Sequence, residues 1–267
     1  MSLKDSYILM IISCKKYLKE RREGQIAQFL KNPQIMQGIR YFHLEGDQSK
    51  FVNNPESKYI IDEKNNIIYT NTEDGYISLP HKIICGLTAI YENYKFNYIL
   101  KTDDDQRLMI NNIFGILDKK IKMENPDYLG KIMKVETHNY PDAKWLINNY
   151  KVLFPKTYYV GDDLPMSNGR FYGLSHRNVK DLVENKYDEI KKELVEDWAI
   201  AKYQKKEYRA NKMYIETERI FKDIHDYNFR KVSPFPSAMK NHELLVQKHQ
   251  AVAQKREKPR KRRSGFI

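Results

Sequence analysis

The chain has 267 residues, of which 41% are hydrophobic and 31% are charged, a composition that suits a globular domain and excludes an intrinsically disordered chain. The apolar run at 7–14 is shorter than the roughly 18–20 residues that cross a bilayer, and no signal-peptide cleavage site follows it. We therefore expect a cytoplasmic protein without a transmembrane segment, in which Cys14 and Cys85 are buried small hydrophobes rather than a disulfide.

Strands and helices alternate along the first hundred residues. Bulky apolar residues at 7–13 predict a buried parallel strand, and apolar residues at helical spacing predict a helix over 15–31. The segment 47–66 is polar and typical of a loop. Further strands are expected at 38–46, 67–71 and 96–102, with a second helix at 78–94.

The second half of the chain shows a mixed pattern, with no internal repeat and no glycine- or serine-rich linker. Strand–helix alternation of this kind predicts one α/β domain over 1–240 with a mostly parallel sheet, and ligands bind such folds beyond the carboxyl ends of the strands. The expected elements are strands at 127–135 and 157–160, an aromatic and glycine-bearing segment at 167–175, and helices at 176–195 and 196–208.

The formal net charge of +12 is concentrated near the C-terminus. The run QKREKPRKRRSGFI is almost entirely basic and polar, so 241–267 is predicted to be a C-terminal helix and a flexible basic tail. Such a tail contacts polyanions through electrostatics that do not depend on sequence.

Three consecutive aspartates stand where the strand at 96–102 ends, in YILKTDDD. Crowded carboxylates repel one another, by about 1 kcal/mol per close pair even in water. A divalent cation removes that cost, and Mg²⁺ or Mn²⁺ is commonly held by one or two carboxylates together with substrate phosphates. Asp103, Asp104 and Asp105 therefore indicate a metal–diphosphate site, with a solvated turn or a helix cap at Asp105 as the alternative.

The segment YILKTDDD resembles the core motif of the β-1,3-glycosyltransferases of glycosyltransferase family 31, which includes the Fringe-like enzymes. Further blocks resemble the family in the same order and cover roughly 7–225: SCKKYLKERREGQIAQF, YFHLEG, EDGYISLPHKIICGL, SNGRFYGLSHRNVKDL and VEDWAIAKY. The chain departs from the family pattern at three places, all of which concern the acceptor side. The segment EDW…A differs from the family's motif, the glycine segment contains fewer glycines, and residues 162–165 are an apparent insert. The chain also lacks the family's membrane anchor and lumenal cysteine pairs, which suggests a cytosolic relative, in a host cell or virion if a virus encodes it.

The resemblance implies a GT-A-like (Rossmann-like) α/β/α sandwich and a role for each matched residue. Asp105 matches the family's most certain metal ligand, and Asp104 is the next candidate. A histidine would supply a third ligand, and His225 is in about the right place and is preferred over His242. Asp197 matches the catalytic base, with Glu196 as the second choice. The nucleotide or its phosphates would be bound by Arg21, Lys82, Lys101, Asp103 and Asp104, and the sugar or acceptor by Gly169, Phe171 and Tyr172.

Several of these residues also have a structural alternative. Lys82 and Lys101 could be surface lysines, and His225 could be an ordinary surface or core residue. Asp197 and Glu196 suit the first turn of a helix, Arg21 suits a solvated helix face, and Phe171 suits a packed core.

Together the motifs predict a metal-dependent inverting glycosyltransferase that uses Mn²⁺ or Mg²⁺ and moves a sugar from a UDP-sugar to a hydroxyl of a glycan or protein acceptor. The alternative is a non-catalytic, basic, nucleic-acid- or particle-associated protein on a degenerate glycosyltransferase fold.

Overall fold

The computed structural model describes residue 3 and residues 6–134 and 164–224. All of these residues except Ile224 belong to one α/β unit that ends at Asp223. The predicted strand at 157–160, His225 and His242, and the predicted tail at 241–267 lie outside the described residues, so those predictions stay predictions.

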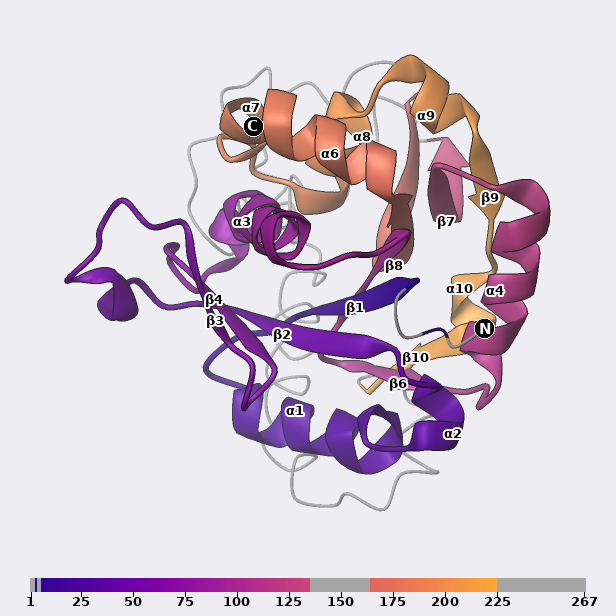
Figure 1. Ribbon diagram of the computed structural model, residues 1–267, viewed down its shortest axis with the longest axis horizontal. Coiled ribbons are helices and arrows are strands. Elements are labelled where there is room, and N and C mark those ends of the chain that lie inside the picture. The colour runs from indigo at the N-terminus through magenta and orange to yellow at the C-terminus, as the bar shows by residue number, and fades with distance from the viewer. Residues whose placement is uncertain (1–2, 4–5, 135–163, 225–267) are drawn as a thin grey trace, which may run out of the picture. The chain divides into compact units, whose positions relative to one another are not determined.

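An eight-stranded sheet with the order β3-β4-β2-β1-β5-β8-β7-β9 forms the centre of this unit, and β10 pairs with β6 in a second small sheet (Figure 1). In the large sheet, β3 and β8 run against the direction of the other strands. The strands are β1 (Tyr7–Ile12), β2 (Arg40–Gly46), β3 (Tyr59–Asp62), β4 (Ile67–Thr70), β5 (Tyr98–Asp103), β6 (Gln106–Leu108), β7 (Tyr128–Lys134), β8 (Pro165–Ser175), β9 (Lys212–Tyr214) and β10 (Phe221–Asp223).

Helices cover both faces of the large sheet, as Figure 1 shows, with α3, α6 and α8 over one face and α1 and α2 over the other. This arrangement confirms the predicted α/β/α sandwich. The helices are α1 (Leu18–Gln25), α2 (Pro33–Met36), α3 (Leu79–Asn93), α4 (Ile113–Glu124), α6 (His176–Asn185), α7 (Tyr187–Ile190), α8 (Glu196–Tyr203), α9 (Lys206–Ala210) and α10 (Thr217–Ile220).

Strand β1 shows why the centre of the sheet is apolar on both sides. All six of its residues are buried. Leu9 and Ile11 belong to the core beneath α2 and α4, and Ile8, Met10 and Ile12 to the core beneath α3. A parallel strand with helices on both faces buries successive side chains on opposite sides, which gives the continuous apolar run that the sequence showed.

Three predicted helices are shorter than the sequence suggested. The helix expected over 15–31 begins at Leu18 and passes into a π-helical turn over Ile26–Leu30. The helices expected over 176–195 and 196–208 each divide in two. The second division falls at Gln204, whose backbone is extended (ψ 145°) and whose side-chain oxygen accepts a hydrogen bond from Asn178 at 2.8 Å.

The sequence prediction did not include strands β3, β6, β9 and β10, and gave the residues of β8 only as an aromatic, glycine-bearing segment. Strand β3 lies within the segment expected to be a loop and pairs with β4 through a turn at Asn66, which has a φ of 52°. Asparagine tolerates this left-handed conformation, and the short edge strand has little apolar signal of its own. Strand β6 follows the aspartates directly and pairs with β10.

Among the described residues, no helix combines the length and the apolar character that crossing a membrane requires. Cys14 and Cys85 are both free thiols; Cys85 is buried as expected, whereas Cys14 is half-buried.

Candidate active site

Acidic residues follow neighbouring strands at the carboxyl edge of the sheet. Because β4, β2, β1 and β5 run parallel and adjacent, their carboxyl ends meet. Asp47 follows β2, Asp74 lies just beyond β4, and β5 ends at Asp103 with Asp104 and Asp105 directly after it. The loop after β1 binds aspartates from two of these strand ends. Lys15 N donates to Asp74 Oδ2 at 2.5 Å, and Cys14 N donates to Asp104 Oδ2 at 3.4 Å.

Asp104 is buried, with 3% of its surface exposed, and is held by a cation on α1. Arg21 NH1 lies 2.9 Å from Asp104 Oδ1, and Arg107 NH1 donates to the Asp104 carbonyl at 3.1 Å. Burial raises the pKa of the Asp104 carboxyl, and the Arg21 guanidinium opposes that shift. Both carboxylate oxygens of Asp104 therefore already accept hydrogen bonds in this structure.

Lys101 of β5 connects the aspartate turn with the start of α8. Its Nζ lies 2.8 Å from Asp103 Oδ1 and 3.4 Å from Glu196 Oε2, and also donates to the Gly169 carbonyl. Lys101 is 1% exposed, yet the carboxylates of Asp103 and Glu196 hold its pKa above the usual range despite burial. Burial acts to raise the pKa of Asp103, to about 7, against the opposing Lys101 charge.

The two acids that begin α8 have different surroundings. Glu196 is buried, and its Oε1 accepts from Tyr172 OH at 2.5 Å while its Oε2 faces Lys101. Asp197 is half-buried and its Oδ1 accepts from Trp198 N at 2.9 Å. A side chain on Gly169 would place its first carbon 3.6 Å from Glu196 Oε2 and 3.8 Å from Asp197 Oδ2. The glycine therefore keeps open the space in front of both carboxylates.

Asp103 and Asp105 are the more accessible members of the aspartate turn, with side chains 32% and 22% exposed. Asp105 Oδ1 accepts from Gln106 Nε2 at 2.9 Å, and its Oδ2 lies 3.9 Å from Arg21 NH1. Within the ranges that the structure describes, no group of three or more His, Cys, Asp or Glu side chains could hold a metal ion. Two hard carboxylate ligands completed by substrate phosphates still fit Mn²⁺ or Mg²⁺, since these ions are often held in that way.

Lys82 stabilises the loop after β1 from α3. It is 2% exposed, and its Nζ donates to Asp74 Oδ1 at 2.5 Å and to the Ser13 carbonyl at 3.1 Å. Although burial acts to raise the pKa of Asp74, the hydrogen bond from Lys82 and its charge bring it below the usual range. In this arrangement Lys82 acts on the candidate site through that loop.

The rings of Phe171 and Tyr172 do not line an exposed surface for the sugar or acceptor, the role that the resemblance implied, and Phe171 follows its alternative of a packed core. Both rings are buried, and Phe171 stacks on Phe221 with 5.1 Å between ring centroids. The two rings point to opposite faces of β8, because side chains alternate along a strand, and each belongs to a different core. Tyr172 reaches the candidate site through its hydroxyl, which binds Glu196.

Several residues of this site were not singled out from the sequence. Asp47 and Asp74 could have been found by the rule that found the aspartate turn, because each follows a predicted strand. Gln25 could not, because its contacts depend on how α1 lies on the sheet: its Nε2 donates to the carbonyls of Asp103 and Gln106 at 2.9 and 3.0 Å. Arg107 and Gly24 also meet only in the folded chain, where the guanidinium lies against the glycine.

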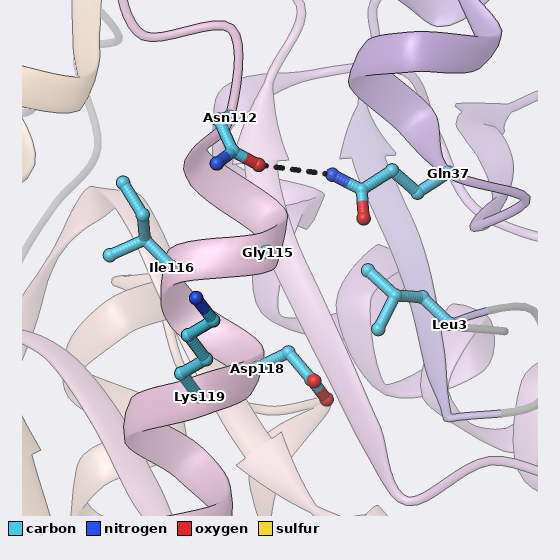
Figure 2. Close-up of a pocket in the computed structure, with 7 residues that line it drawn as sticks. All are labelled: Leu3, Gln37, Asn112, Gly115, Ile116, Asp118 and Lys119. Carbon is cyan, nitrogen blue, oxygen red and sulfur yellow. Dashed lines mark hydrogen bonds between the residues drawn. The ribbon is translucent and has the colours of Figure 1, made fainter. Parts of the chain in front are cut away.

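A cavity of about 490 Å³ shares no residue with this site (Figure 2). Gln37 Nε2 donates to Asn112 Oδ1 across it at 3.2 Å. It lies at α4 and includes Leu3, which precedes β1, whereas the aspartates lie beyond the carboxyl end of β5. We therefore place the candidate active site at the carboxyl edge of the sheet.

Comparisons with known proteins identify the family of the chain. Residues 31–216 match the family model described as Galactosyltransferase, a range that includes the aspartate turn and the acids of α8. A relative named "Probable beta-1,3-galactosyltransferase 12" from Arabidopsis thaliana is 27% identical over 85 residues, which are 32% of this chain and 23% of that protein. The match thus spans less than a quarter of that relative's length. Because the family model covers well over half of it, the chain belongs to the galactosyltransferase family, as its resemblance to glycosyltransferase family 31 predicted.

Proposed function

We propose that this protein transfers a sugar from a UDP-sugar to an acceptor hydroxyl with inversion, in a reaction that depends on Mn²⁺ or Mg²⁺. Membership of the family supports glycosyl transfer. The single observation that carries the finer proposal is the position of Lys101 Nζ between Asp103 of the aspartate turn and Glu196 of α8. The aspartates that would hold the metal and the donor phosphates therefore lie on one side of the Lys101 ammonium, and the acids that begin α8 lie on the other.

On the donor side, Asp103 and Asp105 would hold the cation. The resemblance pairs Asp104 with Asp105 instead, but both oxygens of Asp104 already accept hydrogen bonds, from Arg21 and Cys14. When bound, the ion supplies a Lewis acid that stabilises negative charge on the departing nucleoside diphosphate. Arg107 and Gln25 hold the turn in place through the backbone carbonyls of Asp104, Asp103 and Gln106. The chain thus fixes the direction of the carboxylates before the donor binds.

On the acceptor side, Asp197 is the residue we assign as general base. It would take the proton from the acceptor hydroxyl as the oxygen attacks the sugar from the side opposite the leaving diphosphate. Glu196 is less suited to this task, because Tyr172 and Lys101 occupy its two oxygens. We assign Glu196 the role of holding the start of α8, and with it Asp197, against β5 and β8.

Titration calorimetry with UDP, in the presence of Mn²⁺ and again with excess EDTA, tests the donor side. We expect binding that requires the metal, and a panel of nucleotide sugars assayed for Mn²⁺-dependent hydrolysis then identifies the sugar. The rival is a non-catalytic polyanion-binding protein, which the net charge of +12 would suit. Salt-sensitive binding to DNA with no binding of UDP would favour the rival and overturn the proposal.

A further inference from the structure

A cation of the protein itself already lies at the aspartate turn. Arg21 NH1 is 2.9 Å from Asp104 Oδ1 and 3.9 Å from Asp105 Oδ2, so one guanidinium faces two adjacent carboxylates. The side chain of Arg21 is 17% exposed and that of Asp104 4% exposed, which makes this a partly buried ion pair rather than a surface one. Such pairs resist solvent screening.

A divalent cation bound to Asp105 would compete with this guanidinium. Like charges at contact distance repel, and the repulsion between a dication and a guanidinium is twice that between two unit charges. Asp105 cannot turn away easily, because Gln106 holds its other oxygen at 2.9 Å. Binding of the metal therefore favours movement of the guanidinium away from the aspartates.

Tyr17, one helical turn earlier, also contacts the guanidinium in this arrangement, with its ring centroid 4.1 Å from the guanidinium carbon. Such a cation–π contact stabilises the charge of Arg21 beside the carboxylates. Arg21 also lies in the first turns of α1, which begins at Leu18, next to the loop after β1. No side chain caps this helix, and the N–H groups of a helix start and a guanidinium both suit a diphosphate.

We propose that Arg21 is a positioning residue whose guanidinium, paired with Asp104 beside the proposed metal ligand Asp105, competes with the cation there and transfers to the donor diphosphate when metal and nucleotide bind together. This inference rests on the proposed function. It makes metal and nucleotide bind cooperatively, because the metal alone must displace Arg21 whereas the metal–nucleotide pair gives the guanidinium a new partner.

The test measures four affinities in the full chain: Mn²⁺ alone, by electron paramagnetic resonance of the free ion, UDP alone, and each in the presence of the other. The Arg21→Gln variant removes the competing charge. Arg22→Gln is the matched control, because it removes the same charge from the next residue, whose guanidinium donates to the Asn65 carbonyl.

We expect Arg21→Gln to bind Mn²⁺ alone at least about fivefold more tightly than the parent, the lower end of typical couplings between sites. The factor by which UDP strengthens Mn²⁺ binding should fall correspondingly. Arg22→Gln should change the affinity for Mn²⁺ alone, and the factor by which UDP strengthens it, by less than about twofold. That small change is the effect of the altered net charge alone. Arg21→Lys keeps a charge without the planar fork and should lie between the parent and Arg21→Gln.

The inference is overturned if Arg21→Gln binds Mn²⁺ alone no more tightly than Arg22→Gln, or if the coupling with UDP is unchanged. Should Arg21→Gln fail to fold, which thermal unfolding would reveal, the same comparison between Arg21→Lys and the parent decides. A parent protein that binds no UDP with Mn²⁺ would refute the proposed function instead, so the two failures are distinguishable.

Discussion

The Nζ atom of Lys101 lies 3.4 Å from Oε2 of Glu196, although the two residues are 95 positions apart in the chain. Lys101 belongs to β5 and Glu196 begins α8, and both are buried. Their contact joins the strand that ends in the aspartate turn to the helix that bears the proposed base. It determines how far the donor side and the acceptor side of the site lie from each other.

Replacing Lys101 should destabilise the fold. Lys101→Met removes the cation that faces the carboxylates of Asp103 and Glu196 and leaves Glu196 buried without it. Breaking a buried pair in this way costs about 3–5 kcal/mol, which urea-induced unfolding would measure. The control is Lys122→Met. In the parent, the exposed ammonium of Lys122 pairs with Asp118 on α4, so the unfolding free energy of this variant should change by less than about 1 kcal/mol. Equal losses of unfolding free energy in the two variants would show that Lys101 contributes no more to stability than an exposed lysine does.

Asp105→Asn should greatly weaken Mn²⁺-supported binding of UDP and leave the melting temperature unchanged or slightly higher. The substitution removes one ligand charge and also relieves repulsion among adjacent carboxylates. Calorimetry with and without Mn²⁺ measures the first effect, and thermal unfolding the second. Asp47→Asn serves as the control, because Asp47 lies at the same edge of the sheet but pairs with Lys15 at 3.2 Å. UDP affinity that survives Asp105→Asn and resists EDTA would show that Asp105 is no metal ligand.

Asp197→Asn should separate catalysis from binding. The variant keeps the shape of the side chain and loses its basicity, so transfer should fall by about 10²–10⁴-fold, the usual contribution of a positioned base. Binding of Mn²⁺ and UDP should stay within a few-fold of the parent. Release of UDP in the presence of an acceptor measures the first quantity and calorimetry the second.

Glu196→Gln provides the comparison for Asp197, since glutamine can still hydrogen-bond with Tyr172. It should retain more transfer activity than Asp197→Asn. The opposite order would assign the base to Glu196 and leave Asp197 as the residue that holds the helix.

Stability should fall in mild acid because of His43. Burial on β2, reinforced by Arg22, lowers the pKa of His43 from 6.5 to about 3. The unfolded chain therefore takes up a proton below pH 6.5 while the folded chain does not, so the stabilisation is complete above pH 6.5 and is lost as the pH falls toward 3. The slope is at most about 1.4 kcal/mol of unfolding free energy per pH unit.

The His43→Gln variant isolates this effect. Its amide keeps a polar group beside Gln25, whose Oε1 lies 3.3 Å from His43 Nε2, but does not titrate. Between pH 6.5 and 5 the unfolding free energy of the parent should decrease more steeply than that of the variant, because the carboxyl groups contribute equally to both. Parallel curves from urea titrations at several pH values would show that His43 is protonated in the folded state.

Local pattern was sufficient for much of the architecture. The continuous apolar run of β1 and the strand that leads into the aspartates predicted a buried parallel sheet, because a strand covered on both faces has no polar side. The same reasoning placed the aspartates beyond a carboxyl end, where ligands bind in α/β folds. It failed at β3, whose four residues lie at the edge of the sheet and form a strand only because β4 is there to pair with.

The kinds of groups at the site could be predicted from the order of amino acids alone: an aspartate turn after a strand, an acid pair at a helix start, and a glycine segment between them. Which of these groups meet depends on how the chain folds. Strand order and the insertion of antiparallel β8 beside β5 determine three features of the site. Lys101 faces Glu196, Arg21 neutralises Asp104, and the ring of Phe171 belongs to the core. Contacts between residues many tens of positions apart are set by that packing, and neither helical nor strand periodicity carries information about it.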